Sequence, residues 1–147
     1  MDIKDFLSPE NIVLDFGAVG KAQLLAALSG KAASALDLPR DFVAQCVSDR
    51  DELGSTGIGG GVAIPHARFR ELNRPFAVVA RLKEPIDFEA IDGEPVDLVF
   101  LLLLPASAQL DQLNALAAVA RKLRSADTVR RLRAARSSEQ AFQILVE

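Results

Sequence analysis

The chain is poor in the residues on which disulfide-linked, zinc-binding and membrane-spanning proteins depend. Its 147 residues include one cysteine and one histidine, which exclude an internal disulfide bond and argue against a zinc site. The longest apolar stretch, Leu98 to Leu104, is far shorter than the ~20 residues that cross a bilayer. Residues 1–5 mix charges and lead into no apolar segment, so no secretory signal is expected. Together these absences predict a protein of the reducing cytoplasm, without membrane insertion.

The remaining composition is that of an ordinary globular domain. Half of the residues are hydrophobic and a quarter are charged, and no linker, repeat or low-complexity tract interrupts the chain. At this length one domain buries roughly 68–70% of the surface that the unfolded chain exposes. The net charge of -3 argues against a protein that coats nucleic acid or anionic lipid. We therefore expect one domain over residues 1–147.

Hydrophobic periodicity predicts helices on both sides of a group of strands. The nearly continuous apolar run 96–104 is typical of a central strand that is buried on both faces. After Gln109 the period becomes helical, and Leu110, Leu113 and Leu123 fall on one apolar face. The class predicted is α/β, with one mixed β-sheet flanked by helices. Strands are expected over 11–16, 62–64, 76–82 and 96–104, and helices over 21–36, 39–54 and 109–123, in a short segment capped by Asp127, and after Ser137.

The glycine-dense loop 54–61 fits no familiar nucleotide or hydrolase motif. A dinucleotide fingerprint needs glycine at Val62, a phosphate-binding P-loop needs Lys-Ser/Thr after its last glycine, and a hydrolase elbow needs glycine at Leu53. The acidic cluster between residues 87 and 97 lacks the spacing of a calcium loop and is predicted to be solvated. Cys46 falls on the apolar stripe of a predicted helix, which favours core packing.

Basic residues are concentrated in Arg121 to Arg136. This tract holds seven basic residues and one acidic residue, so it carries about +6, and about -9 remains on the rest of the chain. The tract contains no aromatic residue on which bases could stack, so nucleic-acid binding is not expected. Solvated basic faces of amphipathic helices are the favoured interpretation, and an acidic protein partner remains an alternative.

His66 is the candidate reactive residue. It follows Pro65 directly after the glycine loop, and Arg50 and Arg68 lie on either side of it in the sequence. If the chain stays extended there, His66 and Arg68 share a face, so a guanidinium could meet a phosphate on the imidazole. The residues alone leave an ordinary histidine and a phosphoryl site equally open. The candidate phosphate-binding groups are Arg68, the hydroxyl groups of Ser55 and Thr56 and the backbone N–H groups of Gly57 and Gly59.

Residues 50–66 resemble the active-site signature of enzyme IIA domains of the bacterial phosphoenolpyruvate-dependent phosphotransferase system, of the fructose/mannitol type. The resemblance extends from about Phe6 to Leu145, and a chain of this domain alone is similar to the nitrogen-regulatory subclass. It implies a mixed sheet flanked by helices and a phosphoryl acceptor at His66, loaded by a histidine-containing phosphocarrier protein. It also implies that Arg50 stabilises the phosphoryl group, and that the protein acts like a transferase through a phosphohistidine, without a metal ion or cofactor.

Three positions depart from the pattern of that family. Gln112 stands where members usually have a second histidine, and it can donate a hydrogen bond but cannot take up a proton. Gly60 replaces the usual asparagine in the loop, and Ala67 replaces the usual glycine after the histidine. We expect Gln112 to lie near His66 as a hydrogen-bonding substitute.

Three functions follow from the resemblance. The first is a phosphocarrier whose phosphorylation at His66 regulates target proteins of nitrogen or carbon metabolism. The alternative is the IIA component of a fructose/mannitol-type sugar permease. The third is a pure binding module that no longer transfers phosphate, a reading that Gln112 keeps open.

Overall fold

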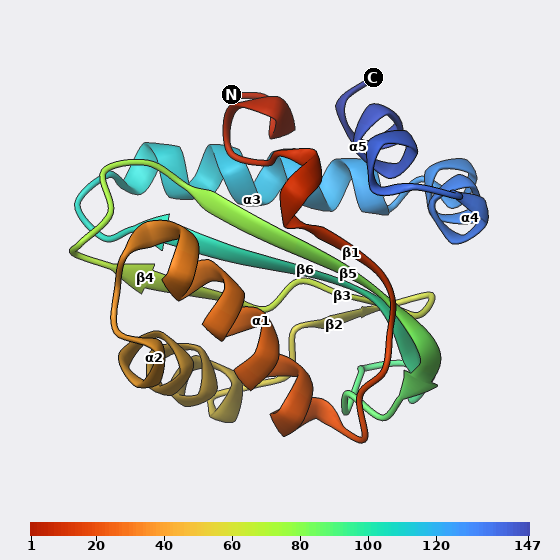
Figure 1. Cartoon of the computed structure of the whole chain (residues 1–147), viewed down its shortest axis with the longest axis horizontal. Helices are drawn as coiled ribbons and strands as arrows, with labels where there is room; N and C mark the ends of the chain where they lie inside the picture. Colours follow the sequence, from red (N-terminus) through yellow and green to blue (C-terminus); the bar gives the residue numbers. More distant parts are fainter.

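A six-stranded mixed sheet lies between two layers of helices in the computed structural model, which describes residues 1–147 (Figure 1). The predicted α/β class is confirmed. None of the helices combines the length and apolar character needed to cross a membrane. The strands are β1 (Ile12–Phe16), β2 (Gly57–Gly59), β3 (Val62–Ala63), β4 (His66–Phe69), β5 (Phe76–Ile86) and β6 (Val96–Pro105); the helices are α1 (Lys21–Leu36), α2 (Arg40–Glu52), α3 (Gln109–Leu123), α4 (Ala126–Ala134) and α5 (Ser138–Val146), and short 3-10 turns cover Ile3–Asp5 and Pro9–Asn11.

Strand β6 is the centre of the sheet. It pairs antiparallel with β5 on one side, and on the other side it pairs in parallel first with β3 and then with β4. Strand β1 is parallel to β5, and β2 forms a hairpin with β3. Val62 is opposite Leu98 and His66 is opposite Leu102, so β3 and β4 follow one another along the same edge of β6. The predicted central strand is thus present and buried.

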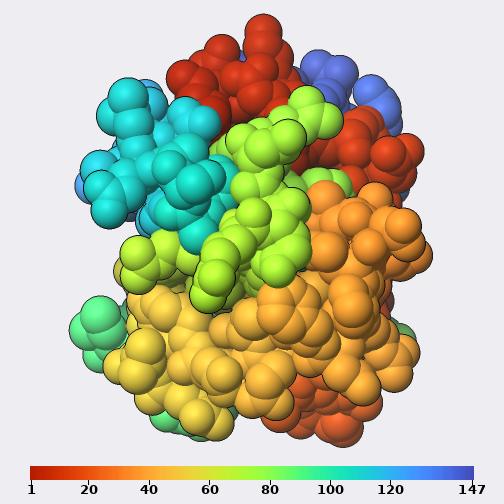
Figure 2. Space-filling view, turned by 90° about the vertical axis from the view of Figure 1, so that its left-hand side faces the viewer, coloured from red at the N-terminus to blue at the C-terminus, as the bar shows by residue number.

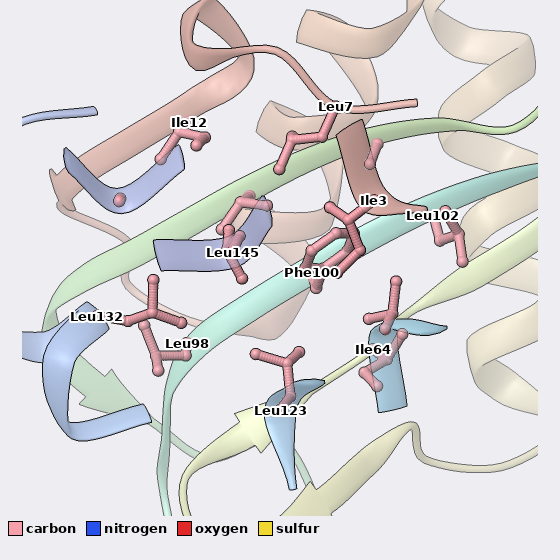
Figure 3. Close-up of a cluster of buried hydrophobic side chains, with 14 of the residues drawn as sticks. Ile3, Leu7, Ile12, Ile64, Leu98, Phe100, Leu102, Leu123, Leu132 and Leu145 are labelled. Carbon is pink, nitrogen blue, oxygen red and sulfur yellow. The ribbon is translucent and has the colours of Figure 1, made fainter. Parts of the chain in front are cut away.

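Each face of the sheet has its own hydrophobic core. Helices α3, α4 and α5 cover one face, and α1 and α2 cover the other (Figure 1). Because side chains alternate along β6, Phe100 and Leu102 enter the first core and Leu101 and Leu103 enter the second. Figure 3 shows the first core, in which Phe100 of β6 lies among side chains of the amino-terminal turns and of α5.

The structure differs from the sequence prediction in four elements. The glycine segment expected to be a loop forms the β2–β3 hairpin, β4 is a strand that was not predicted, and β5 continues to Ile86. Helix α4 is capped by Ser125, whose hydroxyl oxygen accepts the Thr128 N–H at 3.3 Å, and not by Asp127. The cap predicted for α5 is present, since the Ser137 hydroxyl oxygen accepts the Gln140 N–H at 3.0 Å.

The buried face of α3 also differs from the prediction. Leu110 and Leu113 are 71% and 66% exposed, so they do not enter the core. The buried side chains of α3 include one polar residue and one alanine beside two larger apolar residues. They are Gln112, Ala115, Val119 and Leu123.

Arg81 joins the sheet to the carboxyl end of α4. Its Nη1 donates to the carbonyl oxygens of Leu132 at 3.0 Å, Arg133 at 3.3 Å and Ala135 at 2.6 Å. Its Nη2 forms an ion pair with Asp15 of β1 at 3.1 Å. One guanidinium therefore binds the last carbonyl oxygens of this helix, of which that of Leu132 also accepts the N–H of Ala135 at 3.3 Å.

Candidate functional site

His66 is the first residue of β4 and faces an open cleft of about 600 Å³. The cleft lies between the carboxyl end of α2 and the first turns of α3. Figure 2 shows this end of the molecule, with α2 in yellow and orange below and the start of α3 in cyan above. The residues that line the cleft are Cys46, Asp49, Arg50, Leu53, His66, Ala67, Arg68, Leu104, Gln112 and Leu116.

The imidazole of His66 is fixed in one orientation. Its Nδ1 lies 2.9 Å from the carbonyl oxygen of Ile64. A carbonyl oxygen only accepts, so Nδ1 carries the proton in the neutral ring and Nε2 keeps its lone pair. Burial lowers the pKa of His66 from its ordinary value of 6.5, and the charges of Arg50 and Arg68 lower it further, although the hydrogen bond to Ile64 opposes this. The ring is therefore a neutral nucleophile at pH 7.

Two arginine side chains reach the cleft without a carboxylate partner. Arg50, in the last turn of α2, donates from Nη1 to the Gly54 carbonyl oxygen at 3.2 Å. Arg68 lies two residues after His66 on the extended strand β4 and is exposed on the same face. Neither arginine takes part in an ion pair. Both guanidinium groups are thus free to bind an anion beside the imidazole.

An internal ion pair anchors the end of α2 that carries Arg50. Lys21, at the start of α1, lies 2.8 Å from the carboxylate of Asp51, and both side chains are largely buried. The Lys21 ammonium also lies over the ring of Phe88, 5.0 Å from its centroid. Asp51 is therefore held by α1, while its neighbour Arg50 remains available to the cleft.

Gln112 lines the same cleft from the first turn of α3. Its Nε2 donates to the carbonyl oxygens of Pro105 at 2.8 Å and Ala106 at 3.3 Å. These bonds fix the orientation of the carboxamide, because only the nitrogen can donate to a carbonyl. The Nε2 group of Gln112 is therefore already hydrogen-bonded within the chain, and only its Oε1 remains free to accept a hydrogen bond.

The four glycine-loop residues predicted to bind phosphate do not line this cleft. The hydroxyl of Ser55 donates to the carbonyl oxygen of Phe88 at 2.8 Å and accepts the N–H of Gly57 at 3.2 Å. Thr56 is buried, and Gly59 lies in the strand that leads into the hairpin turn. The structure thus places Ser55, Thr56, Gly57 and Gly59 outside the lining of the cleft at His66, and their binding of phosphate stays a prediction.

The carboxylate of Asp92 accepts a hydrogen bond from the turn between β2 and β3. Glycines 59 to 61 all have positive φ, and the N–H of Gly60 donates to Asp92 Oδ2 at 3.0 Å. Hydrogen bonds from the N–H groups of Glu94 and Gly60 lower the pKa of Asp92. The carbonyl oxygen of Gly61 accepts the N–H groups of Asp97 and Leu98, so this turn lies at the start of β6. Asp92 is exposed, as predicted for the acidic cluster, and it also binds the turn.

The sequence analysis missed the apolar surroundings of the cleft. Leu53 lines it and is 84% exposed, and Leu116 lines it from α3. The exposed Leu113 lies one helical turn before Leu116 and therefore extends the same surface. Cys46 packs against the core, as predicted, but its other side faces the cleft. The sequence did contain a pattern that includes Leu113 and Leu116, because α3 has two possible apolar faces. Helical periodicity alone could not show which of the two faces packs on the sheet.

Comparison with known proteins shows the family. Residues 5–147 match the protein family described as "Phosphoenolpyruvate-dependent sugar phosphotransferase system, EIIA 2". A nitrogen regulatory protein of Bradyrhizobium diazoefficiens is 43% identical over 145 residues, covering 99% of this chain and 95% of the relative. The nitrogen regulatory protein of Escherichia coli is 43% identical over 128 residues, covering 86% and 78%.

A solved structure extends this likeness to the whole fold. The nitrogen regulatory protein IIA-Ntr from Neisseria meningitidis superimposes with a TM-score of 0.93 at 34% identity, covering 97% of this chain and 98% of that one. The identity, the coverage and the fold agree, so the chain belongs to the EIIA type 2 family of the phosphoenolpyruvate-dependent sugar phosphotransferase system.

Proposed function

We propose that the protein is a phosphocarrier that accepts a phosphoryl group on Nε2 of His66 and regulates target proteins through its phosphorylation state. The donor is a histidine-phosphorylated carrier protein, and the targets belong to nitrogen or carbon metabolism. The observation that carries this proposal is the hydrogen bond from Nδ1 to Ile64, which leaves a neutral Nε2 in a cleft with two unpaired arginines.

The transfer requires no group beyond the two imidazoles and the charges around them. The lone pair of His66 Nε2 attacks phosphorus, the P–N bond to the donor breaks, and its electron pair stays on the donor imidazole. His66 keeps its proton on Nδ1, hydrogen-bonded to the carbonyl oxygen of Ile64, so the phosphorylated ring is cationic. The donor ring carries a proton on its other nitrogen and therefore leaves as a neutral imidazole. Arg50 and Arg68 neutralise the equatorial phosphoryl oxygens during this step.

The surface around the cleft suits a protein donor better than a small substrate. Leu53 and Leu113 present exposed apolar groups, and Arg50 and Arg68 add positive charge. An apolar centre with charged groups at its margin is the usual composition of a protein interface. The same surface would serve the carrier and the regulated targets in turn.

A regulatory role is favoured over sugar transport. The relatives that are 43% identical are nitrogen regulatory proteins, and they align over most of this chain. We propose that residues 1–147 act as one IIA domain in the cytoplasm, where the free thiol of Cys46 stays reduced. The IIA component of a fructose/mannitol-type permease remains the second candidate, because the mannitol IIA protein of Escherichia coli shares the fold.

Phosphorylation by a purified system tests the chemistry. The protein is incubated with phosphoenolpyruvate and the general phosphocarriers, followed by intact mass measurement and site mapping. We expect one acid-labile, alkali-stable phosphoryl group, absent in His66→Ala, which keeps the fold. Label that persists in this variant, or maps to Ser55 or Thr56, would contradict the assignment. Absence of any label in the natural protein would favour a binding module without transfer.

Binding and uptake measurements separate regulation from transport. Pull-downs with phosphorylated and unphosphorylated protein should recover different regulatory partners, and deletion of the gene should leave fructose and mannitol uptake unchanged. Loss of uptake of either sugar, with no partner that depends on phosphorylation, would support the permease component.

A further inference from the structure

A second cleft, of about 500 Å³, lies between the β2–β3 hairpin and the junction of α3 with α4. It shares no residue with the cleft at His66. Val62, which lines it, pairs with Leu98, whereas His66 pairs with Leu102. Four residues along a strand separate the two positions by about 13 Å. The second cleft is therefore distinct from the phosphoryl site.

The floor of this cleft is apolar. Val62, Leu123 and Val129 are core residues whose outer surfaces form its base, and Ile58 and Ala126 extend the base on two sides. Ile58 is 44% exposed although it is a large aliphatic residue. Ligand pockets usually occupy about 300–1,000 Å³ and are mostly apolar with a few polar groups. The cleft has the size and the floor of such a pocket.

Three arginines of the basic tract stand at the rim. Arg133 is held by Asp97, which accepts from Nε at 2.9 Å and from Nη2 at 2.9 Å, and Nη2 also donates to the Gly60 carbonyl oxygen at 2.7 Å. Its Nη1 has no partner. These bonds fix the guanidinium against the hairpin and leave one end of it free to donate.

The other two rim arginines keep more donors free. Arg130 pairs with Asp127 through Nη2 only, and Arg124 donates from Nε to the Ala120 carbonyl oxygen at 3.3 Å. Arg124 has no carboxylate partner, so both of its terminal nitrogens are available. The positive charge of this tract is thus not fully balanced within the chain at this cleft.

We propose that this cleft binds an amphipathic organic anion: an aromatic or aliphatic body on the apolar floor, and a sulfonate, phosphate or carboxylate group at the three arginines. A planar guanidinium with free N–H groups matches these acidic groups. An inorganic anion leaves the floor in water, and a neutral apolar molecule leaves the guanidinium groups unpaired, so each alone binds more weakly. The proposal does not depend on phosphorylation of His66.

A titration with three probes tests it. Naphthalene sulfonate carries both parts of the ligand, inorganic sulfate carries the acidic group alone, and naphthalene methanol carries the ring alone. Backbone amide NMR shifts report where each probe binds and how tightly. For a ligand of this size we expect a dissociation constant of about 1 mM or lower for naphthalene sulfonate. The shifting amides should lie in 57–62 and 123–133, and the two partial probes should bind at least about fivefold more weakly.

Matched variants decide whether the named residues are responsible. Arg124→Gln removes the unpaired cation and Ile58→Ser removes exposed floor, and each should weaken binding of naphthalene sulfonate about fivefold. Arg136→Gln removes the same charge from an exposed arginine of the basic tract that does not line the cleft, and should leave binding unchanged. Each variant is first checked for an unchanged NMR spectrum elsewhere in the chain.

Several results would overturn the proposal. They are the absence of a saturable shift at about 10 mM probe, a concentration well above the weakest affinity expected; shifts centred on the cleft at His66; equal binding of inorganic sulfate; and equal weakening by Arg136→Gln and Arg124→Gln. Phosphorylation of His66 is measured separately in the same variants, so a failure of one proposal does not count against the other.

Discussion

Arg81, near the start of β6, and the arginines near its other end are used in opposite ways. Arg81 gives its N–H groups to three carbonyl oxygens and to Asp15. Near the other end, Arg50 makes one hydrogen bond to a carbonyl and Arg68 has no carboxylate partner. An arginine whose donors are taken up by the chain stabilises the fold. An arginine left open beside a neutral histidine is available for chemistry.

Replacing Arg50 should have the largest effect and should leave the fold intact. Removing one preorganised donor to a developing charge commonly slows a reaction about hundredfold, so we expect Arg50→Ala to slow phosphorylation by that factor. Arg50→Lys keeps the charge but loses the planar fork, and should slow it about tenfold. Rapid-quench kinetics measure the rate, and Arg70→Ala, at an exposed arginine outside the cleft, is the control. Unchanged kinetics in Arg50→Ala would remove Arg50 from the site.

Replacing Arg81 should lower the stability of the fold and leave the phosphorylation rate unchanged. Arg81→Met removes the hydrogen bond to the partly buried carbonyl oxygen of Ala135 and the ion pair with Asp15, so we expect the free energy of unfolding to fall by about 2 kcal/mol. Urea denaturation measures this, and phosphorylation of the folded variant should proceed at the normal rate. Arg136→Met, at an exposed arginine, should change stability by less than about 0.5 kcal/mol. Equal losses of stability in the two variants would show that the hydrogen bonds of Arg81 do not stabilise the fold.

The exposed leucines at the His66 end should affect docking. Leu113→Ser removes an apolar contact without opening the core, and we expect the Michaelis constant for the phosphorylated carrier to rise about fivefold at an unchanged maximal rate. Ile91→Ser, at a residue that is 90% exposed beside the Asp92 turn, is the matched control. An equal effect of both substitutions would show that general hydrophobicity, and not the leucine surface, controls docking.

Gln112 should tune the site more weakly. Gln112→His introduces a group that titrates, and we expect the phosphorylation rate or the lifetime of phosphohistidine to change about threefold. Gln112→Met removes the hydrogen bonds to Pro105 and Ala106 without adding a titratable group, and so separates the two effects. If neither quantity changes in Gln112→His, or if a structure of the phosphorylated protein places Gln112 away from His66, the residue has no part in transfer.

The smallest expected effect is that of pH near neutrality. Because the pKa of His66 lies below 6.5, the ring is mainly neutral at and above pH 7, and the phosphorylation rate should be nearly constant from about pH 8 to 7. The folded state binds this proton less readily than the unfolded state. The contribution of His66 to stability is therefore present above pH 6.5 and is lost as pH falls through the lowered pKa. A rate that already falls between about pH 8 and 7 would contradict the neutral nucleophile.

Much of the fold could be predicted because its strongest signals are local. The long apolar run of β6 and the helical periods of α1 and α3 appear in the sequence and in the structure at nearly the same boundaries. Arg50, His66, Arg68 and Gln112 line one cleft, and they were singled out by chemistry and by a family resemblance.

The remainder depends on contacts between distant segments. Asp92 meets Gly60 across 32 residues and Arg133 meets Gly60 across 73, and these bonds fix the turn of the glycine hairpin. No short-range pattern contains that information. On α3 a period of 3.6 residues allowed two apolar stripes, and only the position of the sheet decides that Ala115 is buried and Leu113 is exposed.

Strand β6 also determines which parts of the protein unfold together. Its side chains enter both cores and its backbone is paired on both sides, so neither helical layer can leave the sheet without exposing residues such as Leu101 and Leu102. Its amide hydrogens should therefore exchange with solvent only when the whole chain unfolds. The β2–β3 hairpin, held by a two-residue strand, should exchange through local opening. The slowest and the fastest exchanging parts of the sheet would then be hydrogen-bonded neighbours.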